Sequence, residues 1–274
     1  SSFTVLSATE IDATSPPHGP STVNVRVTTP AGESAANSGD HFTYLPEVTI
    51  EFGRCKKVTT GTGKYKNGNC TEAVAGSNYE WTPGLLKGGF TAASLVKTTI
   101  TIEAVGGAKM VCNAESATGE YTGTKQVSNV VIKLTGCEYP SSKAKCATAG
   151  AAEGEVVTNT LEGVLDWVKK ETNKVGLDLS PVAESGVFFE ATCGATTVSV
   201  EGSVITTINP LDNMSSAFTL KYKQKKGKQE RTNFEKEEAD VLKMSVSGGA
   251  FEEAGLGLES ETTNEEELEI STII

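Results

Sequence analysis

The first 45 residues alternate apolar and polar side chains in a pattern that predicts short strands. Val23, Val25 and Val27 are each followed by a polar residue, and a period of two is typical of a strand with one buried face. Residues 30–32, Pro-Ala-Gly, then predict a turn, because proline fixes φ and glycine accepts the positive φ that closes it. After a polar connection, residues 41–45 predict a last short strand.

The rest of the chain repeats short alternating segments, separated by turn residues. The clearest of them are residues 48–52, 98–105, 108–112, 130–134, 187–193, 196–208, 217–222 and 241–246. Gly106 and Gly107 stand between two of these segments and predict a hairpin turn. About a dozen short strands at spacings of roughly eight to fifteen residues predict an all-β fold, either a β-sandwich or a partly open barrel.

One segment fits two structures. Leu161, Val164, Leu165 and Val168 are spaced as on one face of a helix. No clear helix cap precedes them, however, and the polar residues 169–173 predict a hairpin turn into a returning strand at 175–179. We therefore favour two strands over a helix.

The N-terminal residues resemble part of a known module. Residues 2–5, 7–11 and 13–16 are similar to its middle strands, residues 23–32 to its most recognisable hairpin, and residues 42–44 to its closing strand. The module is the IPT/TIG domain, an immunoglobulin-like fold of plexins, some transcription factors and many bacterial surface proteins. The resemblance covers only the C-terminal half of that module, and it implies a fold and a location but no chemistry.

Residues 47–274 resemble uncharacterised secreted proteins of actinobacterial type, and that resemblance carries no known activity. Pro46 follows the last strand of the first region and marks a linker. We therefore predict two domains: a partial IPT/TIG module over residues 1–46, and a larger disulfide-bonded all-β domain over residues 47–274.

Six cysteines predict three disulfides. They are Cys55, Cys70, Cys112, Cys137, Cys146 and Cys193. No C-x-x-C pair is present, and the two histidines, His18 and His41, lie outside the cysteine-bearing region, so a metal site is not expected. Disulfides are typical of an oxidising compartment. The sequence leaves the pairing open; short loops favour Cys55–Cys70 and Cys137–Cys146, which leaves Cys112–Cys193.

The charge and hydropathy of the chain limit the kinds of partner that we expect. The formal net charge is −11 and the sequence pI is about 4.8, which argues against general nucleic-acid binding because that requires a basic face. No apolar run reaches membrane-spanning length. The chain begins at Ser1 without a signal peptide, as we expect of a secreted chain after processing. We therefore predict an extracellular or cell-surface location.

Catalytic patterns are weak. No G-x-S-x-G elbow is present, and both histidines lie in the N-terminal region, so we expect neither a catalytic triad nor a cofactor. Paired carboxylates for glycoside chemistry remain an alternative. The acidic candidates are Glu103, Glu120, Glu155, Glu162 and Asp166, although alternation places such residues on a wet face. Trp81 and Trp167 are candidates for a sugar-stacking platform, or else for core and sheet-edge positions.

Opposite charges are separated along the C-terminal part. Residues 221–236 contain seven Lys or Arg against two Glu, whereas the sequence after Lys243 has no basic residue and is rich in Glu. This arrangement would steer head-to-tail contacts between copies. The alternative is a solvated hairpin tip and a solvated acidic face.

These patterns predict a non-enzymatic, secreted structural or adhesion protein that assembles by strand exchange into a filament. The candidate donor strand is the alternating C-terminal segment with Leu268, Ile270, Ile273 and Ile274, which would complete the half module of another copy. Two alternatives are that strands of the larger domain cover the open edge, or that the chain extends upstream of Ser1. The alternative function is binding or processing of extracellular polysaccharide.

Overall fold

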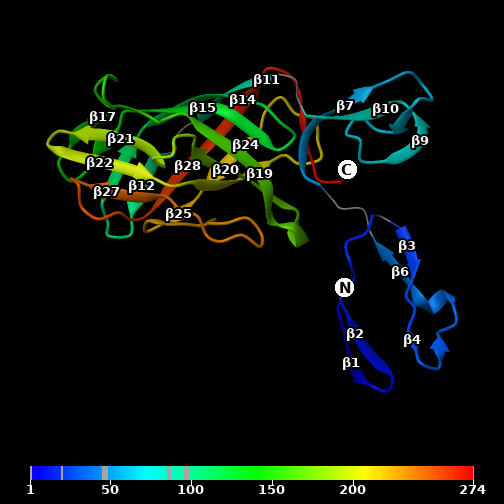
Figure 1. Ribbon diagram of the computed structural model, residues 1–274. Coiled ribbons are helices and arrows are strands. Elements are labelled where there is room, and N and C mark those ends of the chain that lie inside the picture. Colours follow the sequence, from blue (N-terminus) through cyan, green and yellow to red (C-terminus); the bar gives the residue numbers. More distant parts are fainter. Residues whose placement is uncertain (1, 20, 45–48, 85–87, 96–98, 274) are drawn as a thin grey trace. The chain divides into compact units, whose positions relative to one another are not determined.

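The computed structural model describes residues 2–19, 21–44, 49–84, 88–95 and 99–273 (Figure 1). The protein is all-β, with 57% of the chain in strands and 2% helical, which confirms the predicted fold class. The chain divides into an N-terminal unit, Ser1–Val48, and a C-terminal unit, Thr49–Ile274. This division falls two residues from the predicted boundary, which lies outside the described residues.

The N-terminal unit consists of three two-stranded sheets. The pairs are β1 (Phe3–Ser7) with β2 (Glu10–Ala13), β3 (Ser21–Asn24) with β6 (His41–Tyr44), and β4 (Thr28–Thr29) with β5 (Gly32–Glu33). The predicted turn at 30–32 joins β4 to β5, and Gly32 has the positive φ it requires, 131°. The predicted long strand from Val23 is divided between β3 and β4. A short 3-10 turn, η1 (Ser38–Asp40), precedes β6.

The C-terminal unit is built on an eight-stranded antiparallel barrel. In order around the barrel the strands are β11 (Gly88–Ser94), β14 (Ala114–Tyr121), β15 (Gln126–Thr135), β19 (Leu161–Lys169), β20 (Lys174–Pro181), β23 (Val204–Asn209), β24 (Thr219–Tyr222) and β28 (Glu252–Asn264). Pairing of β11 with β28 closes the ring. β18 (Glu155–Val157) adds to the side of β15.

The long strand β28 also belongs to a second circuit of paired strands. Its C-terminal half pairs with β24 and β11 of the barrel, and its N-terminal half pairs with β27 and β12. The circuit continues through β12 (Ile100–Ala104), β13 (Lys109–Cys112), β16 (Glu138–Tyr139), β17 (Ala144–Ala147), β21 (Val187–Cys193), β22 (Thr196–Glu201) and β27 (Lys243–Val246). One continuous apolar core contains residues from both circuits.

The ambiguous segment forms strands, as predicted. β19 and β20 pair antiparallel from Leu161↔Pro181 to Lys169↔Lys174, and a short turn, η2 (Lys170–Thr172), joins them. Leu161 and Leu165 point into the core, whereas Val164 is exposed. The helical spacing was coincidental. Leu161 and Leu165 are an even number of positions apart, so they share one face of a strand as well.

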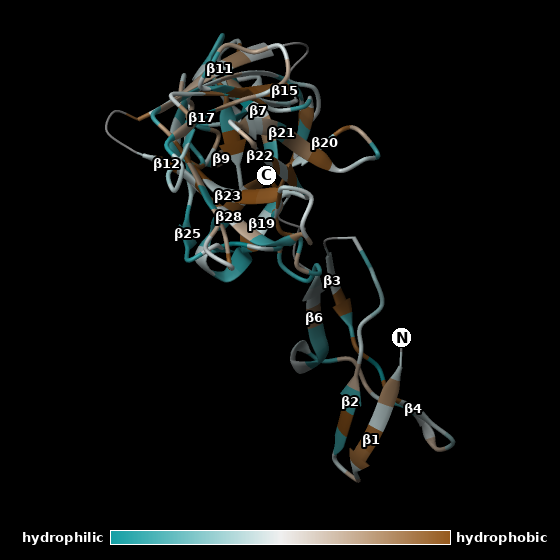
Figure 2. Cartoon of the chain, turned by 90° about the vertical axis from the view of Figure 1, so that its left-hand side faces the viewer, coloured by the Kyte–Doolittle hydropathy of each residue, from teal (hydrophilic) through white to brown (hydrophobic). Residues whose placement is uncertain are grey.

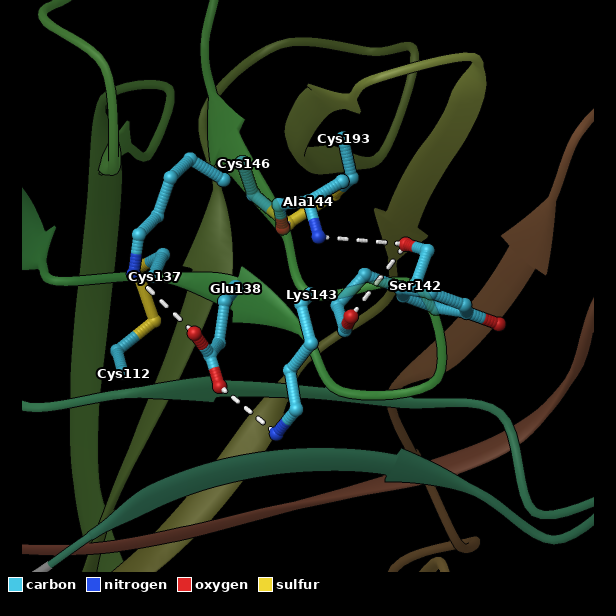
Figure 3. A network of polar contacts seen from close by, with 10 residues as sticks. Cys112, Cys137, Glu138, Ser142, Lys143, Ala144, Cys146 and Cys193 are labelled. Atoms are coloured by element: carbon cyan, nitrogen blue, oxygen red, sulfur yellow. Dashed lines mark hydrogen bonds and ion pairs between the residues drawn. A yellow bond between two sulfur atoms is a disulfide. The ribbon is translucent and has the colours of Figure 1, made fainter.

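Two disulfides link strands of the second circuit at steps where only one or two residue pairs are in register (Figure 3). Cys112–Cys137 spans the step from β13 to β16, where only Val111↔Glu138 is in register, and Cys146–Cys193 spans the step from β17 to β21. The predicted pairs Cys137–Cys146 and Cys112–Cys193 are therefore wrong. Cys137 and Cys146 are neighbours, and the Cys146 amide donates to the Cys137 carbonyl at 3.0 Å. Their disulfides nevertheless go to different strands, that of Cys137 to β13 and that of Cys146 to β21.

The third disulfide, Cys55–Cys70, forms as predicted and lies in a smaller five-stranded sheet. This sheet has the order β29 (Glu269–Ser271), β7 (Glu51–Lys57), β10 (Tyr79–Pro83), β8 (Gly63–Tyr65) and β9 (Ala73–Ser77). Phe52 connects it to the main core, because its ring lies edge-on to that of Tyr121 with centroids 5.0 Å apart. All six cysteines are paired.

Candidate interaction surface

The first hairpin of the N-terminal unit has one apolar face and one polar face. In the β1–β2 register Phe3 lies opposite Ala13 and Val5 opposite Ile11, so these four residues share a face. Thr4 lies opposite Asp12 on the other face. Phe3, Val5 and Ile11 are 71%, 62% and 41% exposed, so no other described part of the unit covers the apolar side.

The β3–β6 strand pair also exposes apolar residues, here aromatic ones. Val23 lies opposite Phe42 in the β3–β6 register. Phe42 packs edge-on against Tyr44 at 5.0 Å between centroids, and His18 stacks on Tyr44 at 4.8 Å. Phe42 is still exposed. His41 lies opposite Asn24 at the start of β6. The aromatic residues therefore pack against one another on this strand pair and leave Phe42 exposed.

None of the described residues of the N-terminal unit is buried. Figure 2 shows apolar bands along β1, β2 and β3 that no second layer covers within the unit. Antiparallel hairpins with one apolar face normally pack that face on a core, and apolar patches of this kind mark interaction sites. We use the term apolar face for the exposed apolar residues of the paired strands, namely Phe3, Val5 and Ile11 of the β1–β2 pair and Phe42 of the β3–β6 pair. Val25 and Val27 are exposed as well and lie between β3 and β4.

The two tryptophans predicted as a platform are not brought together. Trp81 is 8% exposed and packs with the Cys55–Cys70 disulfide, and its indole N–H donates to Glu51 Oε1 at 2.6 Å. Trp167 is partly buried against the main core instead. A buried indole presents no open ring to a sugar. The two positions therefore fit the alternative stated in the sequence analysis, in which the tryptophans are core or sheet-edge residues.

The C-terminal segment proposed as a donor strand pairs within its own chain. β29 pairs with β7 through Ile270↔Phe52, and on its other side the Asp212 amide donates to the Ile270 carbonyl at 2.9 Å. Leu268 and Ile270 are buried, whereas Ile273 is exposed and Ile274 lies outside the described residues. Donation to another copy would require this strand to leave its own sheet.

The five carboxylates singled out from the sequence lie on outer faces, and four of them have polar partners. Glu155 pairs with Lys133 at 3.0 Å, Asp166 with Lys125 at 3.8 Å, and Glu120 accepts from Asn129 at 3.2 Å. Glu103 accepts from Gln224 at 3.1 Å, and Glu162 is exposed. The structure shows these five as solvated or ion-paired groups spread over several strands.

Two other carboxylates, Glu115 and Glu269, are buried and a third, Asp178, is half-buried; sequence reasoning missed all three. Burial raises the pKa of Glu115 although Ser260 donates to it at 2.9 Å. Burial also raises the pKa of Asp178 to about 6, and that of Glu269 to about 8, with Asp212 adding a smaller like-charge contribution to the latter. The phase of β14 could have identified Glu115, because it alternates in step with the inward residues Ala117 and Tyr121.

The opposite charges of residues 221–236 and of the acidic C-terminal segment meet within one chain. Lys221 of β24 lies opposite Glu259 of β28, with Nζ and Oε1 3.6 Å apart. Lys243, which follows the basic block, lies opposite Glu253. Neighbouring strands therefore neutralise part of the charge separation seen in the sequence. Steering between copies stays a prediction.

Within the part of the chain that the structure describes, no group of three His, Cys, Asp or Glu side chains is placed to hold a metal ion. No helix in the described ranges is long and apolar enough to cross a membrane. No family model, curated protein or solved structure matches this chain.

Proposed function

We propose that this protein is a non-enzymatic, extracellular structural or adhesion protein whose N-terminal unit docks onto a second copy of the chain. The carrying observation is the apolar face, which is exposed on every strand pair that bears it. Three disulfides are typical of an oxidising environment and support secretion. An immunoglobulin-like origin of the unit is part of this proposal, since such modules bury two sheets against each other.

A second copy fits this face because the face is self-complementary. The β1–β2 hairpin carries its acidic residues, Glu10 and Asp12, on the side opposite Val5 and Ile11. Two such hairpins can pack face to face, at the usual sheet separation of about 10 Å, without bringing like charges together. Face-to-face packing would supply the second layer that each unit lacks.

The contact is isologous, because the same patch is used by both copies. It therefore predicts a closed dimer. The filament inferred from the sequence would need a further, different contact, and β29 is already paired in its own sheet.

The test is the mass of the protein in solution over a range of concentrations, measured by analytical ultracentrifugation. We expect the wild-type chain to pass from monomer to dimer with a dissociation constant in the range of about 1–100 µM, as is typical of modest apolar interfaces. Val5→Lys places a charge on the apolar face and should weaken dimerisation at least about tenfold.

Thr4→Lys is the matched control, because it adds the same charge to the same strand on the face that carries Asp12. It should leave the dimerisation constant unchanged within about twofold. A wild-type chain that stays monomeric throughout this range, or equal effects of the two variants, would contradict the proposed docking.

A further inference from the structure

A cationic pocket lies on the outer face of the barrel in the C-terminal unit. Outward residues of β20, β23 and β24 form its floor, and the loop after the hairpin β25 (Gln224–Lys225) and β26 (Lys228–Gln229) contributes its wall. The cavity has a volume of about 200 Å³. Lys174, Lys221, Lys223 and Arg231 all line it, although the chain as a whole carries a net charge of −11.

Strand geometry places these cations together. Lys221 and Lys223 are two residues apart and alternate with the buried Leu220 and Tyr222, so both point outward. Thr207 of β23 lies directly opposite Lys221. The two chain segments on either side of the hairpin are held together by the Glu230 amide, which donates to the Lys223 carbonyl at 2.7 Å. This bond keeps Arg231 beside the same pocket.

The positive charge of the pocket is only partly neutralised. Lys221 pairs with Glu259 at 3.6 Å, and Arg231 pairs with Glu230, the acidic residue of the lining, at 3.4 Å. Among the described residues, no carboxylate lies within ion-pair distance of Lys174 or Lys223. Cations that line a concave surface focus the field there and favour anions over the rest of an acidic protein.

Arg231 adds an observation of its own. Its Nε atom is buried and has no hydrogen-bond partner among the described residues. A buried donor without an acceptor is unfavourable, and a guanidinium is the side chain best suited to carboxylate and sulfate groups. Because Glu230 is the one carboxylate paired with this guanidinium among the described residues, an anionic ligand in the pocket would add acceptor oxygens to a cation that is only partly satisfied.

Neutral polar groups complete the lining. Asn173, Thr207 and Asn209 present amides and a hydroxyl next to the cations. A small inorganic ion would be held by the cations alone, whereas a sugar ring would use both sets, with its anionic group on Lys and Arg and its hydroxyls on Asn and Thr.

We propose that this pocket binds an anionic sugar residue, carrying a carboxylate or a sulfate, of an extracellular acidic polysaccharide. This site goes beyond the docking role of the N-terminal unit and stands independently of it, because its lining residues all belong to the C-terminal unit.

Isothermal titration calorimetry of the full chain tests the proposal with defined oligosaccharides. The probes are a galacturonic acid hexamer, a chondroitin sulfate hexamer and neutral maltohexaose. At least one acidic probe should bind with a dissociation constant below about 1 mM, and the neutral probe should bind at least about tenfold more weakly. Whichever acidic probe binds more tightly identifies the carboxylate or the sulfate as the preferred group.

The decisive comparison removes the same charge inside and outside the pocket. Lys221→Gln with Lys223→Gln should weaken binding of the acidic probe at least about tenfold. The control is Lys225→Gln with Lys226→Gln. It removes two cations from the neighbouring hairpin, and neither of these residues lines the pocket. It should change affinity by less than about twofold. Equal losses in both variants would mean a diffuse basic surface and would overturn the site.

A third variant separates a sugar from a bare anion. Thr207→Val keeps the shape of the side chain and removes its hydroxyl. It should weaken the acidic oligosaccharide about threefold or more and leave binding of inorganic sulfate unchanged. Binding of inorganic sulfate as tight as that of the oligosaccharides, or no binding of either acidic probe at millimolar concentration, would also overturn the proposal.

Discussion

Strands β1 and β14 illustrate the difference between the two units. In β14 every second residue is buried, whereas all five residues of β1 are exposed, although both strands alternate. β14 lies in a closed ring between β11 and β15. β1 has β2 as its partner strand in the described pairings, and the apolar side of that pair has no second layer.

The comparison shows that alternation sets which side of a strand is apolar, and that burial then depends on a second layer. In the C-terminal unit the long strand β28 provides it, because its two halves close two circuits around one core. Among its described residues the N-terminal unit has no strand of comparable length, since the longest, β1, has five residues. We propose that a partner provides for the N-terminal unit what β28 provides in the other unit.

The largest contrast is expected from truncating one aromatic residue in each unit. Phe218 is fully buried in the main core, whereas Phe3 is 71% exposed. Phe218→Ala should lower the free energy of unfolding of the C-terminal unit by about 3–5 kcal/mol, because it leaves a cavity. Phe3→Ala should change it by less than about 0.5 kcal/mol. Urea denaturation followed by tryptophan fluorescence measures both, since Trp81 and Trp167 belong to this unit; similar losses would contradict the contrast.

Disulfide removal is expected to have the next largest effect. Cys146→Ala with Cys193→Ala opens a bridge of sequence separation 47, at a step where only two residue pairs are in register. The free energy of unfolding should fall by about 2–4 kcal/mol. Denaturant unfolding of the purified double variant provides the measurement.

Removal of Cys55 and Cys70 is the comparison, because that bridge has a sequence separation of 15 and lies in the small sheet. It should cost less, and hydrogen exchange should increase mainly in β7 and β10. Loss of protection throughout the barrel after removal of Cys55–Cys70 would show that the small sheet is not a separate stability unit.

The sequence predicts the all-β class and most strands, because alternation and turn residues are local signals. It also predicts the paired strands β19 and β20 from the polar turn at residues 169–173. The pairing of Cys112, Cys137, Cys146 and Cys193 was not predictable from loop length, since it depends on which strands lie beside the β16–β17 hairpin. Contacts distant along the chain decide such pairings.

The candidate sites were predictable to a smaller extent. The apolar alternation around Val25 and the basic residues near Lys221 are visible in the sequence. That Lys174 lines the same pocket is not, because β23 places β20 and β24 on its two sides. The burial of Ile270 was also not evident from the sequence. The alternation of residues 268–274 fits a free strand that another copy could accept as well as a strand paired within its own chain.

The ionisation of Glu269 should make the free energy of unfolding depend on pH, an effect smaller than those of core truncation and disulfide removal. Its folded-state pKa is raised from 4.5 to about 8 by burial, so the folded chain retains a proton that the unfolded chain releases above about pH 4.5. Stability is therefore fully present below the unfolded pKa and falls as the pH rises to about 8. Glu269→Gln should remove this dependence and stabilise the C-terminal unit by on the order of 1–3 kcal/mol at pH 8.

Asp178→Asn is the matched control for that measurement. The pKa of Asp178 is raised to about 6 by burial, so its contribution is lost between about pH 4 and 6. Unfolding free energies at pH 4, 6 and 8 should show that Asp178→Asn flattens the lower interval and Glu269→Gln the upper one. An unchanged slope between pH 6 and 8 in Glu269→Gln would mean that this carboxyl does not carry the effect.

The smallest effect is expected from removing the N-terminal unit altogether. All residues of both apolar clusters lie within Thr49–Ile274, so the C-terminal unit carries its own core. Deletion of residues 1–48 should change its free energy of unfolding by less than about 0.5 kcal/mol, and the same deletion should abolish dimerisation. Calorimetry and ultracentrifugation of one truncated chain measure the two results together. A large fall in stability would show that the core depends on the first 48 residues, whereas an intact dimer would place the contact on the C-terminal unit instead.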